Sequence, residues 1–312
     1  MTTLAELPAE VARAEVRIRP WILETPLESS LINAGGVRLY FKLENLQHTG
    51  SFKARGAFSK LLSLDPVARA RGVVAASTGN HGAAVAYAAK MLETRARIVV
   101  PSDANPAKVA AIKSHGGEVL VYGNDSARSE IYARRLAATD DVPYISPYND
   151  AEVVAGQGTV GVELARQLPH ADAVFIALGG GGLLAGVAAY LKSVWPGTVV
   201  VGCSPANSAV MIESIKAGQI LDIPSLPTLS DGTAGGMEPG AITFDWCRSL
   251  GDQYVTVSED EIRQAMRSVL EMHHLAVEGA AGVALAALQR QAGAWRGKTV
   301  VVILCGGNVV KA

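Results

Sequence analysis

Four consecutive glycines, Gly179, Gly180, Gly181 and Gly182, separate an apolar run at 171–178 from a helix-like run at 183–191. A short apolar run followed by glycines and a longer apolar segment is typical of a buried strand that turns into a helix. Because residues without a Cβ adopt almost any φ, several N–H groups can converge on one anion at the start of that helix. The segment therefore predicts a phosphate-binding turn. It is not a nucleotide motif, since no Gly-Lys-Ser or Gly-Lys-Thr follows and the glycine spacing is not that of a dinucleotide fingerprint.

The same alternation of short β-branched runs and alanine-rich amphipathic runs continues along the chain. It predicts an α/β fold of mostly parallel sheet flanked by helices. The predicted strands are 37–43, 73–76, 96–100, 119–122, 173–178, 198–203, 253–257 and 299–304, and the clearest helices are 10–17, 83–92, 106–114, 126–138, 152–167, 183–194, 206–217, 259–272 and 279–289. We expect a large domain from 1–65 and 147–312, a small inserted domain at 66–146, and a ligand crevice between them.

Composition excludes several classes of protein. The 312 residues carry a net charge of -1 and no basic stripe, which argues against nucleic-acid binding. No apolar stretch reaches membrane-spanning length and the N-terminus lacks a signal-peptide pattern, so we expect a cytoplasmic protein without a membrane partner. Cys203, Cys247 and Cys305 are too few and too scattered for a disulfide framework or a zinc site.

A second segment, around Lys53, carries chemistry of its own. Lys53 follows the Gly50-Ser51 turn at the expected start of a helix. The positive end of the helix disfavours an ammonium and makes the free amine more accessible, which suits Schiff-base chemistry. On this segment alone, a solvated first-turn lysine is the more favoured interpretation.

A third segment runs from Ser77 to Gly82, as Ser-Thr-Gly-Asn-His-Gly, between a predicted strand and a predicted helix. Its N–H groups and its hydroxyls can hold a carboxylate, and Asn80 can donate to a phenolic or carbonyl oxygen. His81 is either a general base or, by the more favoured interpretation, a packed histidine.

These segments together resemble one family. Ser51-Phe52-Lys53-Ala54-Arg55-Gly56-Ala57, Ser77-Thr78-Gly79-Asn80-His81-Gly82, Ala155-Gly156-Gln157-Gly158-Thr159, the four glycines and Cys305-Gly306-Gly307-Asn308 occur in the order found in pyridoxal-phosphate enzymes of the threonine/serine dehydratase and serine racemase group. The resemblance spans nearly the whole chain. It implies the tryptophan-synthase-β-like fold, called fold type II, with two open twisted sheets. Because the chain stops just past Asn308, we expect it to lack the regulatory domain of the allosteric biosynthetic threonine dehydratases.

The resemblance also implies roles for the cofactor site. Lys53 would bind pyridoxal phosphate covalently, Phe52 would pack near its ring, and the four glycines would hold its phosphate. Asn80 would donate to the ring 3-oxygen. Cys305 stands where many relatives have a serine facing the pyridine nitrogen. As a neutral thiol it would favour β-elimination over transamination; as a thiolate it would not.

The implied reaction is β-elimination, which converts a 3-hydroxy amino acid such as L-threonine or L-serine to a 2-oxo acid and ammonia. The turn of Ser77, Thr78, Gly79, Asn80 and His81 would hold the substrate carboxylate, and Lys53 would remove the Cα proton. Thr78 takes the place of the serine that reprotonates Cα in the racemases, so racemisation stays open. We expect a homodimer or a higher homo-oligomer.

Two regions depart from the family pattern. Ser204 and Val210 stand where relatives that bind a divalent cation carry acidic residues, which argues against a divalent metal and leaves a monovalent cation open. In the glycine-rich loop at 230–240, Gly236 and Glu238 are candidate substrate contacts. Glu238 is either a partner for a polar or cationic substrate tail or a solvated loop carboxylate.

Further candidates and alternatives follow from the same residues. Glu278 begins a predicted helix near the expected cofactor, and Arg134 is a weaker candidate for the substrate carboxylate. The loop also fits a dehydratase for phenylserine or for a hydroxylated diamino acid of hydroxyectoine breakdown. A β-replacement synthase and a non-catalytic amino-acid-binding protein are the alternatives from other classes.

Overall fold

The structure is a computed structural model that describes residues 2–309. Its strands are β1 (Leu27–Ser29), β2 (Arg38–Lys42), β3 (Val73–Ala76), β4 (Ala96–Val100), β5 (Glu118–Val121), β6 (Ala173–Ala177), β7 (Val199–Pro205), β8 (Gln253–Val257) and β9 (Thr299–Ile303). Its α-helices are α1 (Leu7–Ile18), α2 (Lys53–Ser63), α3 (Pro66–Ala70), α4 (Asn80–Met91), α5 (Pro106–Ser114), α6 (Ser126–Thr139), α7 (Ala151–Gln167), α8 (Gly182–Val194), α9 (Val210–Ala217), α10 (Ile242–Leu250), α11 (Glu259–His273) and α12 (Gly279–Gln291). The α/β class is confirmed.

The larger of two sheets has the strand order β1-β2-β9-β6-β7-β8. All its neighbours are parallel except β1, which pairs antiparallel with β2. Strand β9, the last in the chain, lies between β2 and β6, so early and late segments are neighbours here. This pairing brings the end of β9 close to the start of α2.

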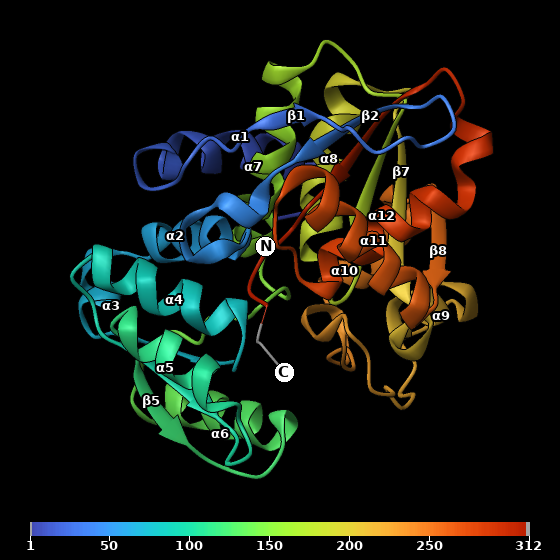
Figure 1. Cartoon of the computed structure of the whole chain (residues 1–312). Coiled ribbons are helices and arrows are strands. Elements are labelled where there is room, and N and C mark those ends of the chain that lie inside the picture. The colour runs from blue at the N-terminus through green and yellow to red at the C-terminus, as the bar shows by residue number, and fades with distance from the viewer. Residues whose placement is uncertain (1, 310–312) are drawn as a thin grey trace.

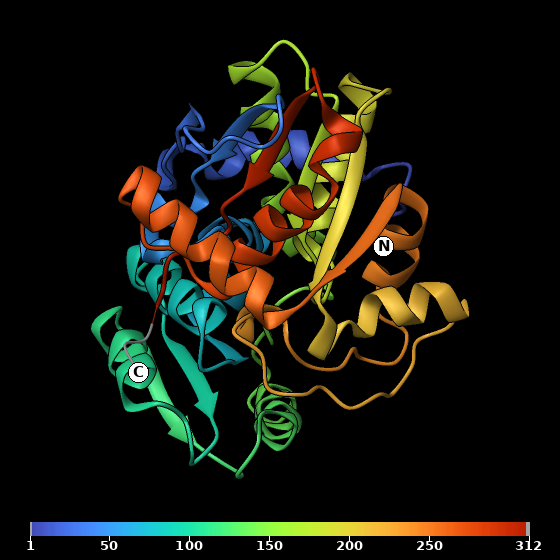
Figure 2. The same ribbon diagram turned by 45° about the vertical axis from the view of Figure 1, so that its right-hand side comes forward.

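The smaller sheet has the order β3-β4-β5 and is parallel throughout. In both Figure 1 and Figure 2, the cyan and green segment that contains these strands and α3–α6 forms a block below the large sheet. The two expected sheets are therefore present. The domain boundaries at 65/66 and 146/147 stay a prediction.

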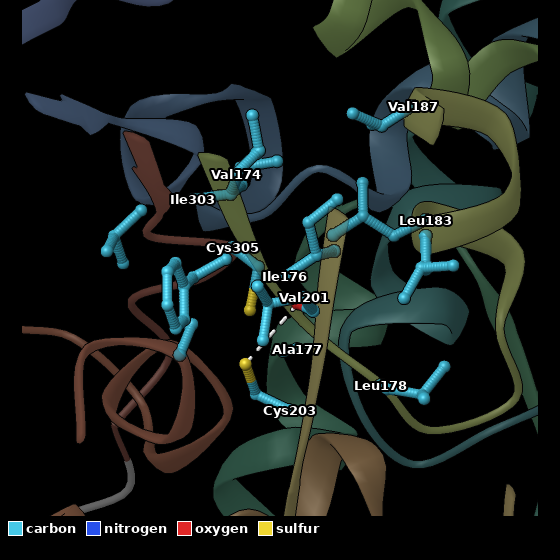
Figure 3. Close-up of a cluster of buried hydrophobic side chains, with 14 of the residues drawn as sticks. Val174, Ile176, Ala177, Leu178, Leu183, Val187, Val201, Cys203, Ile303 and Cys305 are labelled. Carbon is cyan, nitrogen blue, oxygen red and sulfur yellow. Dashed lines mark hydrogen bonds between the residues drawn. The ribbon is translucent and has the colours of Figure 1, made fainter. Parts of the chain in front are cut away.

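The main core lies on the large sheet. Every residue of β6 is buried, as expected of a parallel strand that helices cover on both faces. Helices α8 and α12 both contact β6 and β7. Figure 3 shows Val174, Ile176, Val201 and Ile303 of three strands packed together, with Cys305 just past the end of β9. The carboxyl ends of β6 and β9 thus lead directly into the glycine turn and Cys305.

Local differences from the predicted elements have local causes. The helix expected at 206–217 is split into a 3-10 turn, Ala206–Ser208, and α9, because Ala209 has φ -107° and ψ 35°. Strand β1 has only three residues, of which two are exposed, so it lacks the apolar alternation that would reveal it. Among residues 2–309, no helix is long and apolar enough to cross a membrane.

Candidate active site

Lys53 is held at the carboxyl end of the large sheet by backbone contacts on both sides. Ser51 forms a β-bridge with Gly306, and the Phe52 N–H donates to the Cys305 carbonyl at 3.1 Å. Helix α2 begins at Lys53, whose Nζ donates to the Pro147 carbonyl at 2.9 Å and lies 5.2 Å from the centroid of the Phe52 ring. The first and last predicted motifs are therefore in direct contact.

The Lys53 amine is adapted to nucleophilic chemistry. Burial lowers its pKa to about 8, although Cys305 and Glu278 act in the opposite direction. An unperturbed lysine has a pKa of about 10.4 and is almost entirely protonated at neutral pH. The structure favours the first interpretation of Lys53 over a solvated first-turn residue, because Lys53 is half-buried and its amine is hydrogen-bonded within the protein.

The glycine turn has the properties of an anion cradle. None of the N–H groups of Gly179, Gly180, Gly181 and Gly182 donates to another residue in the described part of the chain, and α8 begins at Gly182. Gly181 has φ +87°, in the left-handed region that favours glycine. Four free amides at a helix start fit a phosphate group.

The turn before α4 offers a second set of free amides. The Gly79 N–H donates to Ser77 Oγ at 3.1 Å, whereas no acceptor within 2–309 takes the N–H of Thr78, Asn80 or His81. A Cβ built on Gly79 would meet nothing within 4 Å, so open space lies beside the turn. Free donors next to open space fit a carboxylate.

Asn80 is engaged within the protein. Its Nδ2 donates to both carboxylate oxygens of Glu278, at 2.9 Å each, and its Oδ1 accepts from Asn308 Nδ2 at 2.7 Å. Burial raises the pKa of Glu278 to about 7, against the effect of the Asn80 hydrogen bonds. Since an amide nitrogen carries two hydrogens, donation by Asn80 to a cofactor oxygen requires the release of one Glu278 contact.

His81 has the properties of a packed histidine. Its ring is buried, and Nε2 lies 2.9 Å from the Ile145 carbonyl. A carbonyl only accepts, so Nε2 carries the proton of this neutral ring. Burial, followed by the charge of Lys53, lowers its pKa to about 3. The basic atom of this ring is therefore Nδ1, which is buried and has no hydrogen-bond partner within residues 2–309. The His81 backbone N–H is the donor that remains for a substrate.

The Cys305 side chain is buried at the end of β9. Burial raises the pKa of its thiol well above the ordinary value, and the nearby Glu278 carboxylate adds to the shift. The thiol is therefore neutral, which answers the question of its charge that the sequence left open.

The loop at 230–240 is connected to the helices of the small sheet. Asp231 forms an ion pair with Lys108 of α5, and Glu238 forms one with Arg134 of α6 at 2.7 Å. A Cβ on Gly236 would meet nothing within 4 Å, so this glycine borders open space. The interpretation of Glu238 as a solvated carboxylate is wrong, because its side chain is only 20% exposed.

A pocket of about 640 Å³ opens beside this loop. Its lining includes Ile220, Met237, Pro239 and Phe244, but neither Lys53 nor a residue of the glycine turn. The candidate reaction site is instead at Lys53 and the free amides, because this mostly apolar pocket, with Asp222 as its charged lining residue, supplies neither an amine nucleophile nor cationic anion-binding donors.

A buried charge network that the sequence did not reveal supports the start of α2. Arg55 donates to both Glu44 oxygens at 2.8 Å and to Glu163, whose Oε2 also accepts from Lys42 Nζ at 2.6 Å. All four side chains are fully buried. These residues have no periodic spacing along the chain, so no pattern indicates that they meet.

Of the two residues expected near a cation site, Ser204 is hydrogen-bonded within the protein and Val210 is apolar. Ser204 Oγ donates to the Leu178 carbonyl at 2.7 Å, and Val210 begins α9. Within residues 2–309, no group of three or more His, Cys, Asp or Glu side chains could hold a metal ion.

The fold and the site together define a class. A desolvated lysine and two sets of free backbone amides meet at the carboxyl ends of parallel strands, where open α/β sheets bind their ligands. This is the arrangement of an enzyme that holds a phosphorylated, lysine-linked cofactor beside a carboxylate-bearing substrate.

Comparison with known proteins identifies the family. The sequence pattern of the pyridoxal-phosphate dependent enzymes matches residues 18–306, and the chain belongs to this family. It is 38% identical to an L-threonine ammonia-lyase of Thermotoga maritima over 281 residues, which are 90% of this chain and 70% of the relative.

Two solved structures are similar over almost the whole chain. Maize serine racemase has a TM-score of 0.92 at 34% identity, covering 97% of this chain and 93% of that chain. The processed form of threonine deaminase isoform 2 from Solanum lycopersicum has a TM-score of 0.92 at 33% identity, covering 98% and 90%. The predicted membership of the dehydratase and racemase group is confirmed, as is fold type II.

Proposed function

We propose that this protein is a pyridoxal-phosphate-dependent ammonia-lyase that converts a 3-hydroxy amino acid, such as L-threonine or L-serine, to a 2-oxo acid and ammonia. The observation that carries the proposal is the placement of Lys53, whose Nζ donates to the Pro147 carbonyl at the same end of the strands as the two sets of free backbone amides. Burial, which lowers the pKa of Lys53 to about 8, supports it. The similarity to threonine ammonia-lyases and threonine deaminase supports the choice of reaction.

Separate groups of the site would bind the cofactor and the substrate. The free amides of Gly179–182 hold the cofactor phosphate, and Lys53 carries the cofactor. The N–H groups of Thr78, Asn80 and His81 hold the substrate carboxylate. The bound cofactor supplies an electron sink for the charge that develops at Cα.

Proton transfer belongs to Lys53. With a pKa near 8, a large fraction of the Lys53 amine is neutral under mildly basic conditions, so this amine would be able to take the proton from the substrate Cα. The proton taken from Cα would balance the loss of the C3 hydroxyl as water, and hydrolysis of the resulting product would give the 2-oxo acid and ammonia. The neutral Cys305 thiol, which cannot donate as strongly as a cationic partner, favours this elimination over transamination.

Racemisation is a second candidate activity, favoured by the likeness to maize serine racemase. Thr78 supplies the hydroxyl that would reprotonate Cα, but its methyl group restricts the rotamer. Chiral analysis of the products distinguishes the two activities. Formation of the D-amino acid faster than ammonia would overturn the choice of dehydratase.

A substrate panel tests the proposal. Release of 2-oxo acid is measured from threonine, serine, phenylserine and 3-hydroxyaspartate with the protein reconstituted with pyridoxal phosphate. We expect turnover of at least one of them and none with Lys53→Ala. Absence of 2-oxo acid from every 3-hydroxy amino acid would contradict the proposal.

The proposal also covers the cellular location, the oligomeric state and the cation requirement of the enzyme. We place it in the cytoplasm as a homodimer or higher homo-oligomer that acts on a small amino acid and needs no divalent metal, while a monovalent cation remains compatible. Sedimentation measures the oligomeric state, and an assay after EDTA treatment, with sodium and potassium exchanged, measures the cation requirement.

A further inference from the structure

Glu130, Arg134, Tyr144, Asn149 and Glu238 form a cluster where α6 meets the loop at 230–240; we call it the distal cluster. Arg134 donates to Glu130 Oε1 from Nε at 3.0 Å and from Nη2 at 2.8 Å, and its Nη2 lies 2.7 Å from Glu238 Oε2. The Asn149 amide donates to the same Glu238 oxygen at 3.0 Å. The guanidinium carbon lies 4.3 Å from the centroid of the Tyr144 ring.

The charges in this cluster do not balance. Glu130 and Glu238 carry two negative charges against the single positive charge of Arg134, so the cluster has a net charge of -1. Arg134 is paired twice and stacked on a ring, which leaves little of its charge for a further anion. A negatively charged substrate tail is therefore disfavoured here.

One carboxylate oxygen of the cluster lacks a partner. Glu238 Oε1 and the Tyr144 hydroxyl are both buried and form no hydrogen bond in the described chain. A buried charged acceptor without a donor is costly, so this oxygen is a site for a hydrogen-bond donor from outside the cluster. The Oε2 atom of Glu238, by contrast, already accepts from Arg134 and Asn149.

The cluster is linked to the reaction site through Tyr148. Its hydroxyl accepts from the Glu238 N–H at 2.9 Å, and a Cβ on Gly180 would overlap its ring. The preceding residue, Pro147, accepts from Lys53 Nζ. The Glu238 backbone and the glycine turn therefore both contact the Tyr148 side chain, and open space borders Gly235 and Gly236 in the same loop.

We propose that Glu238 Oε1 determines substrate specificity by accepting from an ammonium group at the end of the substrate side chain, so that the preferred substrate is a short 3-hydroxy amino acid with a second, cationic amine. This inference rests on the proposed function. A substrate whose side chain ends in a carboxylate would be repelled by the net negative charge of the distal cluster. A substrate whose side chain ends in a methyl group would leave Glu238 Oε1 without a hydrogen-bond donor.

The test uses ligands that cannot undergo dehydration, because they lack the 3-hydroxyl group. Dissociation constants of L-2,4-diaminobutanoate, L-2-aminobutanoate and L-aspartate, which differ in charge at C4, are measured on the holoenzyme from changes in the visible spectrum. We expect diaminobutanoate to bind about tenfold more tightly than aminobutanoate, and aspartate to bind most weakly. Equal binding of all three, or tightest binding of aspartate, would overturn the inference.

Two variants distinguish recognition of the ligand amine by Glu238 from a purely structural role of the Arg134–Glu238 ion pair. Glu238→Gln should remove the preference for diaminobutanoate and leave the binding of aminobutanoate within about twofold. Arg134→Met should increase the preference, because the net charge of the cluster becomes -2. If both variants weaken the binding of all three ligands equally, the ion pair has only a structural role and the inference is wrong.

Two controls keep the result interpretable. Glu213→Gln makes the same chemical change on α9, where Glu213 is paired with Lys216 at the surface, and should behave as the wild type. Retention of cofactor absorbance shows that each variant is folded. If no 3-hydroxy amino acid is turned over while diaminobutanoate is still preferred, the proposed reaction fails and the charge preference stands.

Discussion

The backbone N–H of Phe52 donates to the carbonyl oxygen of Cys305 at 3.1 Å. This contact joins the residue before Lys53, the lysine proposed to carry the cofactor, to the residue expected to face the cofactor ring. Because β2 and β9 are neighbours in the sheet, an early and a late segment of the chain form one side of the candidate site together.

Replacement of the Cys305 thiol tests this side of the site. Cys305→Ala should leave the Phe52 backbone contact intact, shift the visible spectrum of the holoenzyme and weaken cofactor binding about fivefold, as expected for one hydrogen bond of about 1 kcal/mol. Titration of the apoprotein with pyridoxal phosphate measures the affinity. An unchanged spectrum with unchanged turnover would make the thiol a bystander.

The glycine cradle predicts a specific sensitivity to one methyl group. A Cβ at Gly180 would overlap the Tyr148 ring, so Gly180→Ala should lower stability by about 1–3 kcal/mol and weaken cofactor binding at least tenfold, an order-of-magnitude expectation. Gly197→Ala is the matched control, since a Cβ there meets nothing within 4 Å. Equal behaviour of the two variants in urea unfolding and cofactor titration would contradict the assignment.

The buried charge network predicts a large cost when it is broken. Arg55→Met leaves Glu44 and Glu163 buried without their main partner and should lower the free energy of unfolding by about 3–5 kcal/mol. Arg13→Met, at a pair with a largely exposed arginine, should cost less than about 1 kcal/mol. Similar urea midpoints for both variants would show that the network does not stabilise the start of α2.

Glu278 predicts a pH dependence of stability. Its pKa is raised from 4.5 to about 7, so the folded state holds this proton more tightly than the unfolded state does. The resulting stabilisation is fully present below pH 4.5 and is lost as the pH rises through about 7, a total of about 3 kcal/mol.

Glu278→Gln removes the pH-dependent stabilisation that Glu278 contributes, because glutamine does not titrate. The glutamine carbonyl can still accept from Asn80, so that hydrogen bond is retained. The difference in unfolding free energy between wild type and variant should change between pH 4.5 and 7 and level off above it. Urea unfolding of the apoprotein at several pH values measures it. A pH-independent difference would mean that Glu278 titrates normally.

The sequence best predicted those parts of the candidate site in which backbone N–H groups are the expected ligand-binding groups. The glycines at 179–182 and the turn at 77–82 indicated free amides at helix starts, because glycine and small polar residues leave few other interpretations. The strands at 73–76 and 96–100 were predicted at their observed bounds, since they are mostly buried and largely apolar runs. The strand at 253–257 was also predicted at its observed bounds, although its exposure alternates.

Side-chain partners from distant segments could not be predicted. The pairing of Arg134 with Glu238, and that of Asn80 with Glu278, depends on how loops and helices meet in three dimensions. The neutral state of Cys305 likewise follows from burial, which composition does not reveal. Helix α10 was missed because the chain around it, rich in glycine and proline, is typical of a loop.

The most direct test of the account is to find the residue that carries the cofactor. Purified protein is incubated with pyridoxal phosphate, reduced with borohydride and digested, and the peptides are mapped by mass spectrometry. We predict a coloured protein with the reduced cofactor on Nζ of Lys53, and no such adduct in Lys53→Ala. A protein that stays colourless, or an adduct on another lysine, would contradict the central claim.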